Sequence, residues 1–167
     1  MQNTDRERRR RVSAVGLRQF EQNIREYAPN MYRLALAMLH NRQDAEDAVS
    51  EAVLRAYEKI HTLREADRFK PWIMQITANE ARKIYGKNKR VTPVEDMEAY
   101  MPVFRDEKHE LWDVVMQLEP AYREVIMLYF YERFTMKEIS RIVRVPEGTV
   151  KSRLSRAKAK LREIMEA

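Results

Sequence analysis

Apolar residues recur through the first half of the chain at the three- and four-residue spacing that is typical of amphipathic helices. From Leu17 onward this spacing predicts a helix that Pro29 interrupts, followed by a second helix that Pro29 opens and that runs to about Leu39. Asn41 and Asp44 then have the spacing of a capping pair at the start of the next helix.

The two helices that follow are each predicted to have one apolar face. The apolar face of the first comprises Ala45, Ala48, Val49, Ala52, Ala56, Tyr57 and Ile60. After a polar stretch, Pro71 lies in the first turn of another helix, which Gly86 is expected to end. Its buried stripe is predicted to contain Phe69, Trp72, Ile73, Ile76 and Ile84, and its opposite surface Met74, Gln75, Ala78 and Arg82.

Four more helices are predicted in the second half of the chain. Pro120 separates the first two, over about 110–118 and 121–132. The third is a short helix, which Thr135 caps with Glu138 three residues further on. A tight connection, RVPEG, leads to the last helix, which runs from about 146 to 164. Two short helices joined by a few residues, with the second longer and basic, describe a helix-turn-helix.

The helical wheel of this last helix predicts a nucleic-acid interface. At about 100° per residue, Leu154, Ala157 and Leu161 fall within about 40° of Val150. The opposite side is small and polar, and cations flank it on both sides. Slender side chains reach base edges in a major groove while flanking cations meet phosphates. The predicted DNA-binding residues are Gly148, Thr149, Lys151, Ser152, Arg153, Ser155 and Arg156.

Charge divides the chain into three parts. Residues 1–90 hold 19 basic and 12 acidic side chains, residues 91–112 hold 2 and 6, and residues 113–167 hold 11 and 8. The chain has only three glycines, which disfavours sandwiches and barrels with many tight turns. The predicted fold is therefore all-α, with two small helical domains joined by a flexible linker. The expected parts are a disordered basic tail (1–15), a first domain (16–90), an acidic linker (91–109) and a helix-turn-helix domain (110–167).

The composition and the spacing of the candidate residues do not indicate an enzyme. Cysteine is absent, which excludes disulfides and thiolate sites and fits a reducing cytosol. The three histidines, His40, His61 and His109, lie far apart, and the chain has no Gly-rich phosphate loop. We therefore expect no catalytic residue, no metal and no cofactor. No apolar run approaches the length of a membrane span, and no secretory signal is readable.

Two strings of sequence carry a family resemblance. FTMKEISRIV followed by EGTVKSRLSRAKAKLREIM resembles the −35-reading region of bacterial extracytoplasmic-function (ECF) sigma factors, in the sigma-70 superfamily. DAEDAVSEAVLRAYEKI followed by FKPWIMQITANEARKIYGKNKR is similar to the region of that family that binds core polymerase and reads the −10 element. The resemblance covers about residues 20–90 and 110–167 and implies a two-domain initiation subunit in the cytoplasm.

The resemblance also implies partners and site residues. The partners are core RNA polymerase, promoter DNA and an anti-sigma factor, which is often anchored in the membrane; the chain itself would not insert there. Core polymerase contacts are implied for Asp47, Ser50, Glu51 and Leu54. Contacts with the −10 element are implied for Leu63, Arg64, Asn79, Arg82 and Lys83. Trp72 is expected to be structural.

Three positions depart from the family pattern. Relatives usually carry Gln at Ser50, often an aromatic residue at Leu63 and often a small residue at Arg144. A left-handed residue at Arg144 would be strained by about 1 kcal/mol, so either the turn differs or the arginine contributes a phosphate contact. The alternatives to a sigma factor are a freestanding helix-turn-helix regulator, a helical scaffold without nucleic acid, and an enzyme.

Overall fold

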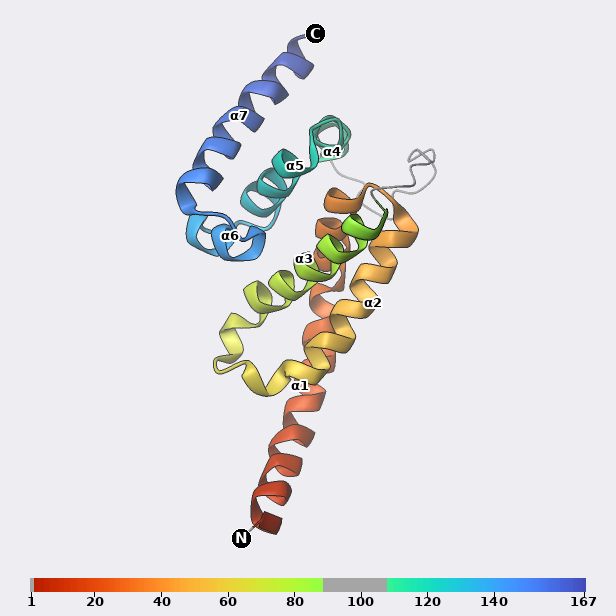
Figure 1. Ribbon diagram of the computed structural model, residues 1–167, viewed down its shortest axis with the longest axis vertical. Helices are drawn as coiled ribbons and strands as arrows, with labels where there is room; N and C mark the ends of the chain where they lie inside the picture. The colour runs from red at the N-terminus through yellow and green to blue at the C-terminus, as the bar shows by residue number, and fades with distance from the viewer. Residues whose placement is uncertain (1, 89–107) are drawn as a thin grey trace.

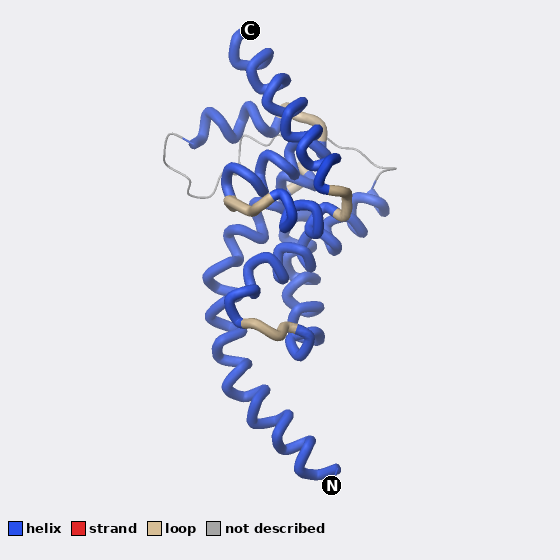
Figure 2. The backbone as a smooth tube through the Cα atoms, turned by 90° about the vertical axis from the view of Figure 1, so that its left-hand side faces the viewer, coloured by secondary structure: helices blue, strands red, loops and turns tan. Residues whose placement is uncertain are grey.

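The structure, a computed structural model, describes the backbone of residues 2–88 and 108–167 and the side chains of residues 16–88 and 111–167. Within these ranges every regular element is helical (Figures 1 and 2). The elements are α1 (Gln2–Leu39), α2 (Arg42–Lys59), η1 (Ile60–Thr62), η2 (Ala66–Arg68), α3 (Phe69–Asn88), α4 (Lys108–Met116), α5 (Pro120–Ile126), η4 (Met127–Tyr131), α6 (Met136–Val143) and α7 (Glu147–Glu166). The all-α prediction is confirmed, and the predicted linker lies almost entirely outside the described residues.

Helix α1 differs from the prediction at two places. It begins at Gln2, where a disordered tail was expected, and it continues through Pro29 without a break. The first 15 residues contain neither Gly nor Pro and are rich in Arg, so local propensity permits a helix there. Pro29 is exposed, while Met31 and Leu34 beyond it are fully buried. Packing of this apolar segment offsets the backbone hydrogen bond that proline cannot donate.

Helices α1, α2 and α3 pack against one another as an N-terminal module. The face of α2 that meets its neighbours consists of Ala45, Ala48, Ala52 and Ala56, all fully buried, and these small side chains let the helices approach closely. Asn41 caps α2 as predicted, because its side chain accepts a hydrogen bond of 2.9 Å from the backbone N–H of Asp44.

Two details of this module correct the prediction. Tyr57, assigned to the apolar face of α2, is 58% exposed. Gly86 does not end α3, which continues to Asn88, and its φ is not positive. A glycine inside a helix costs about 1 kcal/mol relative to alanine but does not by itself stop the helix.

Helices α4 to α7 form the C-terminal module. The helix predicted over 121–132 is a continuous helical run, which widens from α to π geometry at Met127–Tyr131. Thr135 and Glu138 form the predicted capping box at the start of α6. Arg144 adopts the left-handed conformation, with φ 56° and ψ 45°, so the tight turn is retained and an arginine occupies its strained position.

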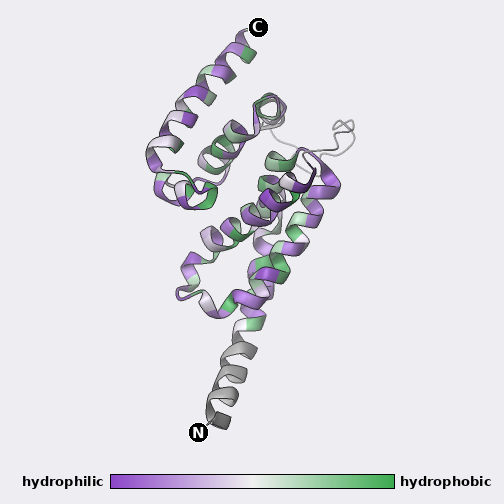
Figure 3. Cartoon of the chain, viewed as in Figure 1, coloured by the Kyte–Doolittle hydropathy of each residue, from purple (hydrophilic) through white to green (hydrophobic). Residues whose placement is uncertain are grey.

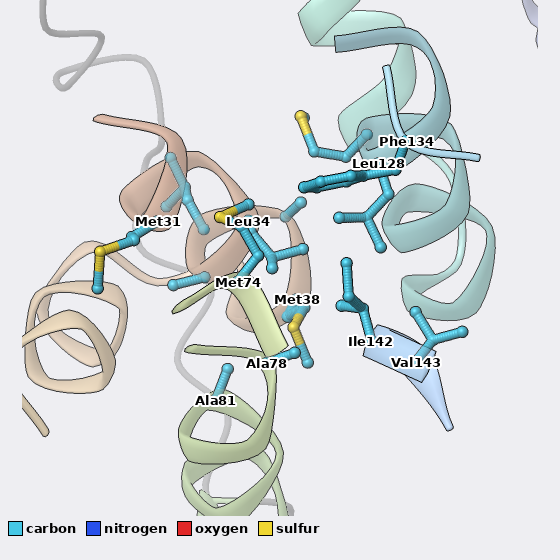
Figure 4. Close-up of a cluster of buried hydrophobic side chains, with 14 of the residues drawn as sticks. Met31, Leu34, Met38, Met74, Ala78, Ala81, Leu128, Phe134, Ile142 and Val143 are labelled. Carbon is cyan, nitrogen blue, oxygen red and sulfur yellow. The ribbon is translucent and has the colours of Figure 1, made fainter. Parts of the chain in front are cut away.

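The two modules pack directly against each other, α1 against α5 and η4, and α3 against α6. Buried side chains from both modules meet in one cluster (Figure 4). Met74 and Ala78, predicted to lie on the outward surface of α3, are fully buried there. The pattern along α3 could not show this, because the covering residues come from a distant part of the sequence.

Candidate nucleic-acid interface

Helix α7 presents its polar strip outward. Val150, Leu154 and Ala157 are buried against the rest of the C-terminal module. The predicted DNA-binding residues on the other side are solvent-exposed at Gly148, Lys151, Ser152, Ser155 and Arg156, and partly exposed at Thr149 and Arg153. Figures 1 and 3 show α7 at the edge of the molecule and largely hydrophilic. The helix therefore has the surface that a major groove requires.

The charge of Arg153, one of the cations that flank the polar strip of α7, also acts on the carboxyl group of Glu124 in α5. Burial raises the pKa of the Glu124 carboxyl to about 7, while the charges of Arg82, Arg153 and Arg123 act in the opposite direction. Arg82 belongs to α3 and Arg153 to α7, so one carboxyl of α5 lies in the field of cations from both modules.

Two hydrogen bonds between Ser140 and Val145 close the turn between α6 and α7. The Ser140 hydroxyl donates a hydrogen bond of 2.6 Å to the carbonyl of Val145, and the backbone N–H of Val145 donates one of 3.2 Å to the carbonyl of Ser140. Arg144 between them is exposed. Its side chain thus points to solvent beside the N-terminus of α7, where a phosphate would be favoured.

The segment between α2 and α3 lines a pocket of about 340 Å³. Leu63 and Arg64, both predicted to meet the −10 element, are among its lining residues. Glu138 and Arg141 of α6 also line it, so the pocket lies between the modules. Asn79, which was expected beside Leu63 and Arg64, is not part of the lining.

Asn79 and Arg82 instead pair with each other. One terminal nitrogen of Arg82 donates to the side-chain oxygen of Asn79 at 2.6 Å and to the backbone carbonyl of Ile142, in α6, at 3.0 Å. Burial lowers the pKa of Arg82. Lys83 is exposed and forms an ion pair of 2.9 Å with Glu80. Of the residues predicted for the −10 element, Arg82 is therefore bound to the C-terminal module in this arrangement.

The predicted polymerase-binding residues share one exposed face of α2. Asp47, Ser50 and Glu51 are exposed, and Leu54 is 58% exposed, on the side opposite the buried alanines. Tyr57 lies three residues beyond Leu54 and extends this face with a second large apolar side chain. The sequence analysis assigned Tyr57 to the core because its side chain is apolar, although its helical phase lies within about 20° of that of the exposed Ser50.

The charged cluster around Glu132 was not predicted from the sequence. This fully buried carboxylate is surrounded by Asn30, Arg33 and Lys70 of the N-terminal module. The hydrogen-bonded partners Asn30 and Glu132 are 102 positions apart, and no local spacing links them. The adjacent charged residues Glu132 and Arg133 in the otherwise aromatic string YFYERF are a weak local signal, and they do not indicate the partners of Glu132.

Metal and membrane sites do not appear in the described part of the chain. Among residues 16–88 and 111–167, no group of three or more acidic or histidine side chains is placed to hold a metal ion. Nor is any helix within the described ranges long and apolar enough to cross a membrane.

The fold and the exposed strip of α7 define a two-module, all-helical protein with a C-terminal helix-turn-helix. Residues 24–91 match the family "Sigma-70 region 2", and residues 108–161 match "Sigma-70, region 4". The chain belongs to the sigma-70 family of RNA polymerase sigma factors, within the ECF group, as the resemblance implied.

Relatives support this membership over most of their length. RNA polymerase sigma factor SigV of Bacillus subtilis (strain 168) is 29% identical over 138 residues, which cover 80% of this chain and 83% of SigV. ECF RNA polymerase sigma factor SigM of the same strain is 29% identical over 147 residues, covering 83% of this chain and 90% of SigM.

Solved structures show the same fold. The sigma factor RpoE in complex with the anti-sigma factor NepR from Bartonella quintana superimposes with a TM-score of 0.70 at 22% identity, covering 89% of this chain and 97% of that one. CnrH in complex with the cytosolic domain of CnrY superimposes with a TM-score of 0.63 at 21% identity, covering 88% and 87%.

Proposed function

We propose that the chain binds core RNA polymerase and directs it to specific promoters, where its N-terminal module (16–90) reads the −10 element and its helix-turn-helix (110–167) reads the −35 element. The observation that carries this proposal is the exposed polar strip of α7, backed by a buried apolar stripe in a helix-turn-helix. In this role the chain is a cytoplasmic, non-catalytic subunit.

The proposed contacts follow the surfaces described above. On α7, Gly148, Thr149, Lys151, Ser152, Arg153, Ser155 and Arg156 meet the −35 duplex. On the N-terminal module, Leu63, Arg64, Asn79, Arg82 and Lys83 meet the −10 element. On α2, Asp47, Ser50, Glu51 and Leu54 bind polymerase. The likeness to RpoE in its complex with NepR supports an anti-sigma factor as a further partner.

Reconstituted transcription tests the proposal. Core polymerase is mixed with the purified chain and a library of duplexes randomised in the −35 and −10 elements, and the transcribed members are sequenced. We expect a defined promoter to be transcribed only when chain and core are both present, with weak DNA binding by the chain alone. Tight DNA binding without polymerase, together with no polymerase association, would instead establish a freestanding regulator.

Charge reversal at Glu51 tests the polymerase-binding face. Glu51→Lys should weaken core polymerase binding and leave the fold intact, because Glu51 is exposed and opposite charges across an interface govern association. Glu21→Lys, an exposed reversal on α1, is the matched control. Equal polymerase affinity for both variants in a fluorescence binding assay would remove the assignment to this face.

A further inference from the structure

The first part of α1, residues 2–15, is strongly basic, and we call it the arginine arm. Its backbone is continuous with the rest of α1, which runs from Gln2 to Leu39. At about 1.5 Å per residue, the arm adds about 20 Å to the helix. Figure 1 shows it, in red, projecting away from α2 and α3. Five arginines against two acidic residues leave it a net charge of +3; these residues are Arg6, Arg8, Arg9, Arg10 and Arg11, with Asp5 and Glu7.

The arm leaves the N-terminal module beside the segment that connects α2 and α3. Phe20, which follows the arm on α1, is buried, and its ring centre lies 6.1 Å from that of Tyr57, near the end of α2, and 6.1 Å from that of Phe69, the first residue of α3. The connection between these two helices contains Leu63 and Arg64, which the proposed function assigns to the −10 element. The base of the arm therefore lies at the end of the module where −10 contacts are proposed.

The sequence of the arm lacks an apolar stripe. Residues 2–11 contain no apolar residue, and the first one in the arm is Val12. At about 100° per residue, the five arginine positions are distributed around the helix axis rather than along one face. A helix that packs on a protein, or that lies in a membrane surface, needs an apolar face. Residues 2–11 have none, so their charges point to a polyanion as the partner of the arm.

A polyanion also favours the helical form of the arm. Arg6 and Arg10 are four positions apart, and like charges at this spacing oppose helix formation. The acidic residues Asp5 and Glu7 offset only part of this repulsion, because the arm keeps its net charge of +3. Phosphate groups near the arm reduce the repulsion, and their binding releases condensed counterions. Helix formation in the arm and phosphate binding therefore support each other.

We propose that the arginine arm is a further DNA-binding element, which contacts the phosphate backbone of the duplex next to the −10 element without reading its sequence. Duplex DNA carries one negative charge per about 1.7 Å of its axis, so an arm of about 20 Å spans enough phosphates for all five arginines. Phosphate contacts raise affinity for every sequence, while base contacts supply specificity. The placement beside the −10 element rests on the proposed function, whereas the affinity of the arm for duplex DNA does not.

Salt titrations of the free chain on a scrambled duplex test the arm without polymerase. The triple change of Arg8, Arg9 and Arg10 to Gln should lower the slope of log affinity against log salt by about 2–3 units and weaken binding about tenfold or more at low salt. Glutamine has nearly the helix propensity of arginine, and circular dichroism checks that the helix content is kept. The same three positions changed to Lys keep their charge and should bind as the natural chain does. Equal slopes for the natural chain and the glutamine variant would overturn the proposal.

Single changes supply the matched control. Arg9→Gln should lower the salt slope by about one unit, because one phosphate contact is lost. Arg25→Gln, at an exposed arginine in the packed part of the same helix, should leave the slope unchanged. An equal loss in both variants would show that net charge alone acts, and this would overturn a contact made by the arm. Weaker binding of the triple glutamine variant to vesicles of anionic phospholipid, with DNA binding unchanged, would also overturn the proposal and assign the arm to a membrane surface.

Cleavage mapping then locates the arm on the promoter. The chain has no cysteine, so Gln2→Cys attaches an iron chelate that cleaves nearby DNA to the arm alone. In the complex of chain, core polymerase and the promoter selected above, we expect cleavage next to the −10 element. Glu166→Cys, at an exposed position near the other end of the chain, is the control and should not cleave there. Cleavage by the arm only at the −35 element, or none, would overturn the placement. If no transcribing complex forms although the salt slope of the free chain falls in the glutamine variant, the proposed function and the placement fail, and the phosphate contact of the arm stands.

Discussion

Helices α3 and α7 are both proposed to meet DNA, yet they differ in what covers them. The polar strip of α7 is exposed, and its apolar side is buried within its own module. On α3, by contrast, Arg82 donates to a carbonyl of α6, while Asn79 is partly exposed and Lys83 is exposed. The proposed −35 contacts are thus open to solvent in this arrangement, whereas one of the proposed −10 contacts, Arg82, is held by the C-terminal module.

The contact between α3 and α6 is expected to contribute most to stability. Ile142 is 1% exposed and lies where the two modules meet (Figure 4). Ile142→Ala should lower the free energy of unfolding by about 2–4 kcal/mol through lost burial and the cavity left behind. Urea unfolding followed by circular dichroism measures this change. Met165→Ala, at a 67% exposed residue of α7, is the control and should stay within about 0.5 kcal/mol of the natural chain.

The free energy of unfolding should depend on pH through the carboxyl group of Glu124, which lies between the two modules' cations. Its pKa is raised to about 7 in the folded chain, so between about pH 4.5 and 7 the folded state retains a proton that the unfolded state releases. Stability should therefore fall as pH rises through this window and level off above it. Glu124→Gln remains neutral throughout and should be more stable than the natural chain at pH 8 by up to about 3 kcal/mol, and equal at pH 4.5. Parallel stability profiles from urea unfolding would contradict the raised pKa.

Arg156 tests what the exposed strip of α7 reads. Arg156→Ala should weaken binding of polymerase holoenzyme to the selected −35 element by about 1–3 kcal/mol if the guanidinium meets a base edge. If it meets only phosphate, the loss should be similar on every sequence and the salt slope should fall by about one unit. Arg162→Ala, six residues further along the same helix, is the matched control. Salt titrations on specific and scrambled duplexes separate the two outcomes.

Arg144 is expected to give the smallest effect. Its φ of 56° places a non-glycine residue in the left-handed region. Arg144→Gly should raise the free energy of unfolding by about 0.5–1 kcal/mol, because glycine adopts this conformation without strain. If the arginine also meets a phosphate, the variant should bind all duplexes more weakly. A variant that is less stable by urea unfolding would show that the Arg144 side chain stabilises the turn by more than the strain costs.

Local features of the chain were largely predictable. The Asn41 cap, the capping box of Thr135 and Glu138, and the apolar stripe of α7 all follow from residue type and helical spacing. The exposed face of α2 also followed, since four alanines had to be buried and their opposite side was left for solvent. These features involve residues within one or two turns of one another, where periodicity is informative.

Errors arose where local signals were weaker than packing. Pro29 and Gly86 usually end helices. Helix α1 passes through Pro29 because Met31 and Leu34 beyond it are buried in the module core, and α3 continues past Gly86 to Asn88, whose side-chain amide donates a hydrogen bond of 2.8 Å to Asp44 of α2. Met74 and Ala78 have the outward phase on α3 and are nevertheless buried. A partner surface from a distant segment changes burial without leaving a trace in the local pattern.

Residue type and spacing within single segments were enough to predict most of the helices, the helix-turn-helix and the basic strip of α7. The packing of α6 on α3, the hydrogen bond from Arg82 to Ile142, and the position of Glu132 among Asn30, Arg33 and Lys70 became visible only in the folded chain. These contacts join residues about 60 to 100 positions apart, and burial of a charge becomes favourable only after the chain has brought its counter-charges together.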